Sequence, residues 1–491
     1  MKKKDNIRIL QLAGAVVLLA HVTLGQFAED ALRFSQLGLS VGARSLGMGN
    51  ATVGSVNDYS ALFWNPAGLA SMRSYEFSVG LSGQSFGNDA TFLGVNSGSR
   101  ITSTNLNNLG FVYPVPTKRG SLTFAFGYGR VNDFTSNVTV EGFNPTSSMV
   151  QSQTPGTNLN NLSANDRRDL LDSNIPYQLY LAEIDTVNNV LVPLVTGNVK
   201  QTATVREGGG LNHWSFGGAM DVAPNLAVGA TFNVVSGGYT YDREFIETDV
   251  QNFYTGVPND FSRFTFESTI KSNLSGYNAL FGLMFRKQGV MKLGLAVRTP
   301  TFYEIEETFT DDGKSFFDNG DFYSIGFSNS TKYKITTPIV LSGGASFQLG
   351  EWLVLSGDAE YTDWTQMEFN TDNPDLIAEN RDIKRIFKPT TNLRGGAELT
   401  LWDLGLRLRG GIVWNPSPYK ADEGSASYDQ LYFTSGLGLM VDDNTTLNIA
   451  YALGTWKTFR DNYYLSSIPN PSRTSERVNT NNVNVTLSYR F

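Results

Sequence analysis

The chain has 491 residues, no Cys, only two His and a formal net charge of −8. Without Cys it has no disulfides, no thiolate metal site and no cysteine nucleophile, and two His cannot build a multi-histidine zinc or iron site. Only 17% of the residues are charged, whereas Gly is abundant at 49 residues. We therefore expect no cofactor and no metal, and most hydrolase and metalloenzyme classes are excluded.

Residues 1–25 have the pattern of a secretory signal peptide. A basic start precedes a short apolar stretch, and Thr23 and Gly25 occupy the positions before a predicted cleavage at Gln26. After cleavage, 34 basic and 45 acidic residues remain, a net charge of −11. Such an acidic surface excludes a nucleic-acid binder on electrostatic grounds. Past residue 25, no apolar run reaches the length of about 18 residues that a transmembrane helix needs.

Strict alternation of apolar and polar residues indicates β-strands. In 483–491 every odd position is apolar and every even position polar, which gives a strand with one apolar and one polar face. The same reasoning predicts fourteen strands, near 75–86, 107–116, 120–131, 211–222, 225–237, 263–287, 290–303, 331–349, 351–369, 390–400, 403–415, 430–441, 444–456 and 479–491.

The predicted connections between these strands alternate between tight turns and long loops. The long ones are 87–106, 132–210, 238–262, 304–330, 370–389, 416–429 and 457–478. Short turns at one end and long loops at the other are typical of outer-membrane barrels. We therefore predict an all-β fold: a 14-stranded antiparallel transmembrane β-barrel over 75–491, in the outer membrane of a Gram-negative bacterium. With an even strand count, both termini lie on the periplasmic side.

Tryptophan placement supports a membrane barrel, because indole favours the two membrane–water interfaces. Two tryptophans fall at predicted short-turn ends, Trp352 and Trp402. Four others fall at or near predicted long-loop ends, namely Trp214, Trp364, Trp414 and Trp456. The alternative is that these aromatics merely cap strand ends, as they do in any β protein.

Residues 26–74 do not alternate, precede the first strand and are rich in Gly and turn-forming residues. We expect them to fold inside the barrel as an N-terminal hatch, or plug. Four of them are the candidate gating residues: Asn65, Pro66, Ala67 and Gly68. Pro66 fixes its own backbone, Asn65 can bond main chain, and Gly68 tolerates unusual angles, so this turn is suited to hold the hatch against the wall.

The segment 65–69 (Asn-Pro-Ala-Gly-Leu), the segment 293–300 (Leu-Gly-Leu-Ala-Val-Arg-Thr-Pro) and Tyr361-Thr362-Asp363-Trp364 with Asp358 together resemble the FadL-type outer-membrane transporters of fatty acids and other hydrophobic compounds. The resemblance implies a fourteen-stranded barrel with an N-terminal hatch, capture of ligand at extracellular loops, and release sideways through the barrel wall. The opening 42–49 (Gly-Ala-Arg-Ser-Leu-Gly-Met-Gly) also resembles PorV-type barrels. The alternative function is thus a secretion-system shuttle or surface-protein binding component.

Two further sets of residues are candidates for ligand contact. The longest predicted loop, 132–210, is too apolar for a purely solvated loop, and its capture candidates are Leu170, Leu171, Tyr177 and Tyr180. Strand phase points several arginines into the lumen, and the candidates for anchoring a carboxylate are Arg298, Arg394, Arg407 and Arg409. The alternatives are self-packing of the loop, and lumen arginines paired with acids such as Asp358, Glu360 and Glu398.

Two other features, His213 and the acidic run 304–312, do not indicate a catalytic or metal site. His213 has no Ser or Asp placed with it, so we expect no enzyme activity. The acidic run 304–312 lacks an ordered calcium-loop pattern and is interpreted as a solvated loop. The predicted function is passive uptake of a fatty acid or hydrocarbon by a monomeric protein. The predicted partners are that ligand, outer-membrane lipid and the barrel-assembly machinery, which would recognise Phe491. No nucleic-acid partner is expected.

Overall fold

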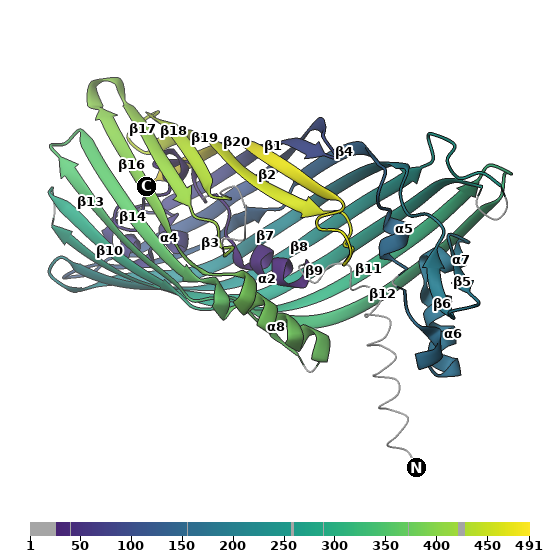
Figure 1. Ribbon diagram of the computed structural model, residues 1–491. Helices are drawn as coiled ribbons and strands as arrows, with labels where there is room; N and C mark the ends of the chain where they lie inside the picture. The colour runs from purple at the N-terminus through teal and green to yellow at the C-terminus, as the bar shows by residue number, and fades with distance from the viewer. Residues whose placement is uncertain are drawn as a thin grey trace, which may run out of the picture.

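The computed structural model describes residues 26–39, 41–154, 156–256, 260–287, 289–371, 373–420 and 428–491. The predicted signal peptide, 1–25, lies outside the described residues. Within them, one antiparallel sheet of eighteen strands closes on itself where the first strand pairs with the last, from Glu76 opposite Arg490 to Phe92 opposite Thr474. The result is a long barrel (Figure 1).

Four strands of the sheet continue a neighbour after a short break, so the wall has fourteen strand positions, as predicted. In chain order they are β1 (Glu76–Phe92), β2 (Val95–Val115), β3 (Leu122–Asp133) with β4 (Ser136–Asn144), β7 (Val199–Ala223), β8 (Leu226–Thr248), β9 (Phe261–Lys287), β10 (Met291–Arg298) with β11 (Phe302–Phe317), β12 (Phe322–Thr336) with β13 (Val340–Leu349), β14 (Leu353–Asp363) with β15 (Glu368–Asn370), β16 (Pro389–Leu401), β17 (Leu406–Asn415), β18 (Gln430–Met440), β19 (Thr445–Asp461) and β20 (Arg473–Arg490).

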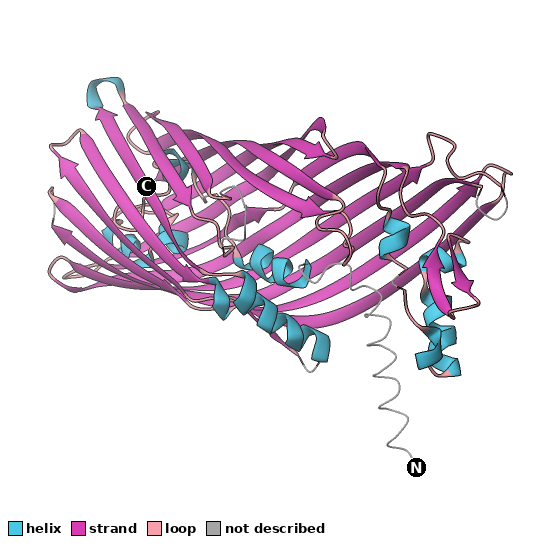
Figure 2. Cartoon of the chain, in the orientation of Figure 1, coloured by secondary structure: helices cyan, strands magenta, loops and turns pink. Residues whose placement is uncertain are grey.

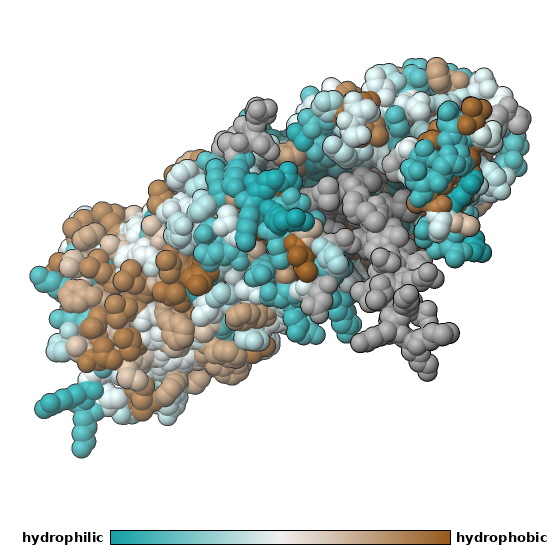
Figure 3. All heavy atoms as spheres, turned by 60° about the horizontal axis from the view of Figure 1, so that its bottom comes forward, coloured by the Kyte–Doolittle hydropathy of each residue, from teal (hydrophilic) through white to brown (hydrophobic). Residues whose placement is uncertain are grey.

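Several strands are far longer than a membrane requires. β9 has 27 residues, about 90 Å at roughly 3.3 Å per residue, whereas about 9–11 residues cross a bilayer. The exposed large apolar side chains gather toward the short-turn end, for example Leu81, Phe216, Phe281, Leu295 and Leu408. Figure 3 shows this apolar belt at one end of the barrel and a hydrophilic surface at the other. The barrel therefore extends well beyond the membrane at its long-loop end.

This extension corrects four predicted loops: 87–106 and 304–330 are largely strand, and 238–262 and 457–478 are about half strand. β1 and β2, for instance, are joined only by Leu93 and Gly94. Outside the bilayer both faces of a strand can be polar, so the alternation that marks a membrane strand is lost there.

The structure also corrects the predicted interface positions of two of the six tryptophans, Trp364 and Trp456. Trp214, Trp352, Trp402 and Trp414 point outward, with 39–57% of their surface exposed. Trp364 is buried in the lumen, where its indole N–H donates to the Thr390 hydroxyl at 2.8 Å, because a 3-10 turn, η3 (Trp364–Gln366), interrupts its strand. Trp456 is on the inward phase of β19 and lines a lumen cavity.

The segment before β1 lies inside the barrel, so the hatch in the lumen is confirmed. It contains α2 (Gln26–Ser35), α3 (Ala43–Gly47), α4 (Ala61–Trp64) and the 3-10 helix η1 (Pro66–Ser71), which Figure 2 shows among the strands. Its buried apolar residues, such as Leu62 and Leu69, join one core with inward-facing residues of the wall, such as Val112 and Met284.

A second packed body lies at the long-loop end of the barrel. Between β4 and β7 the chain forms α5 (Met149–Ser152), η2 (Leu159–Asn161), α6 (Ala164–Ser173), α7 (Ile175–Gln178) and the hairpin β5 (Ala182–Asp185) and β6 (Val190–Pro193). We call residues 145–198 the outer cap. Its Met149, Leu179 and Leu181 are buried in one cluster with Phe261 and Phe264 of β9. Among the described residues, no helix is long and apolar enough to cross a membrane.

Candidate functional site

The Asn65–Pro66 turn fixes the hatch to the wall. The side-chain N–H of Asn65 donates to the carbonyl oxygens of Val53 in the hatch, at 2.8 Å, and Leu283 in β9, at 3.2 Å. Its side-chain oxygen accepts the N–H of Ala67 at 3.1 Å, which caps η1. Asn65 is fully buried, so all three bonds are shielded from water.

Glycines on the wall allow this turn to approach the strands at backbone distance. A Cβ added to Gly229 of β8 or Gly282 of β9 would overlap atoms of the Asn65–Ala67 segment. Gly396 and Gly411 receive the hatch backbone at Met48 and Gly49 in the same way. The Gly-rich strands therefore allow the hatch backbone to pack directly against the wall, and a larger side chain at these glycines would prevent that contact.

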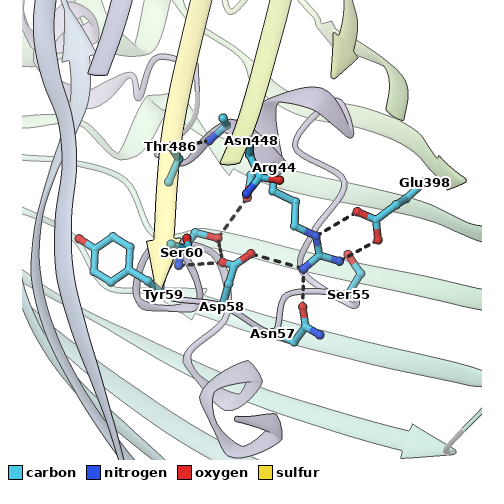
Figure 4. Close-up of polar contacts among 12 residues, drawn as sticks. Arg44, Ser55, Asn57, Asp58, Tyr59, Ser60, Glu398, Asn448 and Thr486 are labelled. Carbon is cyan, nitrogen blue, oxygen red and sulfur yellow. Dashed lines mark hydrogen bonds and ion pairs between the residues drawn. The ribbon is translucent and has the colours of Figure 1, made fainter. Parts of the chain in front are cut away.

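A buried ion cluster ties the hatch to the wall near the short-turn end of the barrel (Figure 4). Arg44 of α3 contacts Glu398 of β16 at 3.2 Å and Asp58 of the hatch at 3.4 Å, and it also bonds Asn57. Burial by itself raises the pKa of Asp58, but the Arg44 guanidinium and the Ser60 hydroxyl outweigh it and hold that pKa below 3.8. Asp58 therefore stays ionised and keeps Arg44 in place.

Directly on the hatch lies a cavity of about 140 Å³. One side of it is aromatic, formed by Phe63 and Trp64 of the hatch with Tyr303 and Trp364 of the wall. The polar part of the lining consists of amides and hydroxyls joined in a row of hydrogen bonds. Asn233 of β8 donates to Asn278 of β9 at 2.8 Å, Asn278 donates to Thr301 between β10 and β11 at 2.8 Å, and the N–H of Thr301 donates to Thr337 between β12 and β13 at 2.8 Å.

Two of the four candidate arginines line this cavity. Arg394 is neutralised by Glu360, with N–O distances of 2.7 and 3.3 Å, and lies over the Trp64 ring at 5.3 Å. Arg298 donates to the carbonyl oxygen of Phe63 at 3.0 Å, and its Nε is buried without a partner. Because one carboxylate serves two guanidiniums, the cavity carries a surplus positive charge at Arg298.

The other two candidate arginines lie elsewhere. Arg409 is fully buried against the hatch, with its Nε 2.6 Å from Glu398 and its Nη1 2.9 Å from Asn448. Arg407 lines a separate vestibule of about 1200 Å³ at the short-turn end, together with Lys292. The structure thus places two of the four arginines in the cavity and one in the vestibule, while Arg409 is buried between the hatch and the wall.

The capture candidates do not reach the cavity. Leu170 and Leu171 on α6 and Tyr177 on α7 are half-buried within the outer cap, and Tyr180 is 60% exposed. The Tyr180 ring packs against Tyr323 of β12 at 4.4 Å. These residues hold the outer cap together and attach it to the barrel rim.

His213 is buried against the hatch: it is 3% exposed and stacks on Phe63 at 6.4 Å. The described residues contain no cluster of potential metal ligands. The acidic run 304–312 is strand β11, not a solvated loop, and Glu306 pairs with Lys332 of β12.

Comparisons with known proteins agree with this architecture. Neither a protein-family profile nor a curated protein sequence matches the chain. Among solved structures, the toluene transporter TodX of Pseudomonas putida is similar with a TM-score of 0.55 at 13% identity, over 92% of this chain and 98% of that one. A Pseudomonas aeruginosa FadL homologue is similar with a TM-score of 0.54 at 12% identity, over 93% and 99%. The chain therefore has the fold of these outer-membrane barrels, as the motifs predicted.

Several cavity residues escaped the sequence analysis. Asn233, Asn278 and Thr301 are inward-facing polar residues among many others, and only the barrel's register aligns them. A possible signal was the Asn at both 233 and 278, because amides on the inner face of two consecutive strands can pair. Trp64, next to the gating turn, carried no periodic pattern.

Proposed function

We propose that this protein is a non-enzymatic outer-membrane channel for hydrophobic compounds, of the FadL type. The observation that supports this most is the cavity that lies on the hatch inside a closed barrel, with an aromatic wall and one surplus guanidinium. A transporter of this kind needs a ligand-binding site immediately before its gate. The solved barrels with this fold include a toluene transporter and a FadL homologue.

The cavity size favours a small ligand. At about 140 Å³ it is close to the volume of about 150 Å³ that accommodates benzene in an engineered protein cavity. We infer a ligand with a body the size of one aromatic ring, placed against Phe63 and Trp64, and an acidic group directed to Arg298. A long fatty acid could place only part of its chain here.

The gate is the hatch. Phe63 and Trp64, directly before the turn at Asn65–Gly68, line the cavity, and Asn65 of the turn bonds Leu283 of β9. The vestibule lined by Arg407 is a separate cavity at the short-turn end. Passage therefore requires the hatch to shift, and direction comes from consumption of the ligand inside the cell.

The test compares labelled toluene, benzoate and hexadecanoate in cells that express the full chain. Arg298→Gln should slow benzoate uptake about tenfold to a hundredfold, since a charge-assisted hydrogen bond contributes roughly 1.5–3 kcal/mol, and leave toluene uptake unchanged. The control is Arg477→Gln on the exposed face of β20. Equal losses for benzoate and toluene would make Arg298 structural. No uptake above empty cells, with a secreted protein co-purifying, would favour the secretion-shuttle alternative.

A further inference from the structure

Positively charged residues gather on the surface around α8 (Pro374–Ile386), the helix that connects β15 with β16. The segment 381–388 contains four bases and one acid, Asp382, which pairs with Arg385 at 2.9 Å. We call these four bases and a fifth from the segment after β17 the basic patch: Arg381, Lys384, Arg385, Lys388 and Lys420. The predicted mature chain has a net charge of −11. An excess of four positive charges in one place is therefore a local feature of an acidic protein.

Packing determines which face of α8 is exposed. Leu376 and Ile383 are buried in one cluster with residues of the hatch. Figure 1 shows α8 at the side of the barrel. Residues three and four positions apart lie on the same face of a helix. The face away from the buried residues carries three exposed bases of the patch at this spacing, namely Arg381, Lys384 and Arg385.

The segment that follows β17 adds Lys420 to the patch. The N–H of Lys388 donates to the carbonyl oxygen of Pro418 at 2.8 Å, and the N–H of Lys420 donates to that of Ile386 at 2.8 Å. The Lys420 ammonium also donates to the carbonyl oxygen of Lys384 at 2.6 Å. The end of α8 and the segment 418–420 are thus held side by side, which brings their bases together.

The basic patch lies just beyond the apolar belt. Leu393 of β16 is opposite Trp414 of β17, and their side chains are 46% and 39% exposed. An exposed indole marks the membrane–water interface. Lys388 is five residues further along β16, which corresponds to about 13 Å above Leu393 for a strand tilted by about 40°. Because long basic side chains can bend back toward the membrane, the patch is within reach of the lipid headgroups. Figure 3 shows hydrophilic atoms directly beside the apolar belt.

The chemistry of the patch suits phosphate carried by a lipid. Guanidinium and ammonium groups form charge-assisted hydrogen bonds with phosphate oxygens. The exposed face of α8 also carries Ile377, which is 49% exposed, and Leu393 and Trp414 lie on the membrane side. Bases beside apolar side chains are typical of surfaces that contact both the headgroups and the acyl chains of an anionic lipid. A soluble anion would have no use for the apolar neighbours.

We propose that the basic patch binds the phosphate groups of a phosphorylated glycolipid, lipid A, in the outer leaflet, whose acyl chains lie against Leu393 and Trp414. The site follows from the predicted orientation, in which the long-loop end is outside the cell. It is separate from the cavity and does not depend on the proposed channel function. The bound lipid holds α8 at the membrane surface and fixes the depth of this side of the barrel in the bilayer.

The test measures lipid binding to the full protein by native mass spectrometry, in buffer without divalent cations. The lipids are bisphosphorylated, monophosphorylated and phosphate-free lipid A. Each base near an anionic surface contributes roughly a fivefold preference. The triple variant Arg381→Gln, Lys384→Gln, Lys420→Gln should therefore raise the Kd for bisphosphorylated lipid A about a hundredfold. Affinity should fall with each phosphate that the lipid lacks, and added salt should weaken binding by screening.

The matched control removes the same charge from exposed positions on β2, β9 and β20, with the triple variant Arg100→Gln, Lys271→Gln, Arg477→Gln. It should leave the Kd within about twofold of the unmodified protein, because these bases are outside the patch. Unchanged heat-modifiable mobility on gels shows that both variants are folded. An equal loss in the control would overturn the patch as the binding site, and tight binding of phosphate-free lipid A would overturn phosphate recognition.

Two competitors distinguish the sources of phosphate. Inorganic phosphate at millimolar concentration should not displace lipid A, and phosphatidylglycerol should bind more weakly, since it has one phosphate and fewer acyl chains. Displacement by inorganic phosphate would make the patch a site for a soluble anion and overturn the lipid assignment. Equal binding of phosphatidylglycerol, lost to the same degree in the patch variant, would overturn the assignment to a glycolipid.

Discussion

Asn65→Ala should release the hatch without unfolding the barrel. The substitution removes three buried hydrogen bonds, to Val53, Leu283 and Ala67. A typical bond contributes about 1 kcal/mol, and a buried N–H left without a partner, here that of Ala67, costs about 1–3 kcal/mol more. The Leu283 carbonyl also belongs to the β9–β10 pair, so the loss of its bond to Asn65 costs less free energy. We therefore expect docking of the hatch to weaken by about 3 kcal/mol, or about a hundredfold in the docked fraction.

The assay is single-channel conductance of the full protein in planar bilayers, together with limited proteolysis. Asn65→Ala should open more often and be cleaved within the hatch, while its heat-modifiable mobility on gels should match that of the unmodified barrel. Gly282→Ala should act similarly from the wall side, since the added Cβ would overlap the Asn65 side-chain oxygen.

The double variant checks the mechanism. Asn65→Ala removes the atom that Gly282→Ala would strike, so the combined effect should be smaller than the sum of the two single effects. Unchanged conductance in Asn65→Ala, or strictly additive effects in the double variant, would refute the view that this turn seals the hatch against β9.

Glu247→Leu should make the outer cap protease-sensitive while the rest of the barrel stays resistant, because it removes the acceptor of Ser148, Met149 and Gln201. Arg409→Ala should destabilise the protein by about 3 kcal/mol in urea unfolding, since Glu398 loses a fully buried partner, whereas Arg407→Ala should change stability by less than about 0.5 kcal/mol. Burial raises the pKa of Asp30 in α2 from 3.8 to about 7, against the opposing effect of Arg33. The packed state therefore favours the protonated acid, so α2 packing should be strongest below about pH 4 and weaken as the pH rises to about 7, and Asp30→Asn should abolish this change in protease sensitivity. Mass spectrometry of the purified protein should give a mature chain that starts at Gln26, and a retained 1–25 segment would contradict the signal-peptide prediction.

The sequence predicted all fourteen strand positions because, within the bilayer, each strand has one face in lipid and one in the lumen. Strict alternation such as that of 483–491 follows from this division. The same division into a lipid face and a lumen face explains why some strand segments were wrongly predicted as loops. Where β1, β2 and β11 rise above the membrane, both faces can be polar, and those stretches were predicted as loops.

Strand phase correctly predicted that the lumen arginines lie on the inner face of the wall, but it did not predict their functions. Arg394 and Arg409 are neutralised by Glu360 and Glu398, while Arg298 is left with a surplus charge because its strand passes beside an acid that is already paired. Which acid faces which base depends on the register of strands far apart in the chain.

By itself, then, the amino-acid sequence determined the barrel, its strand number and the presence of an N-terminal hatch, because these follow from the periodicity and composition of continuous segments. Only the tertiary structure decided where the cavity lies and which arginine faces it. Those features depend on contacts between residues hundreds of positions apart, such as Arg44 with Glu398, which no local pattern records.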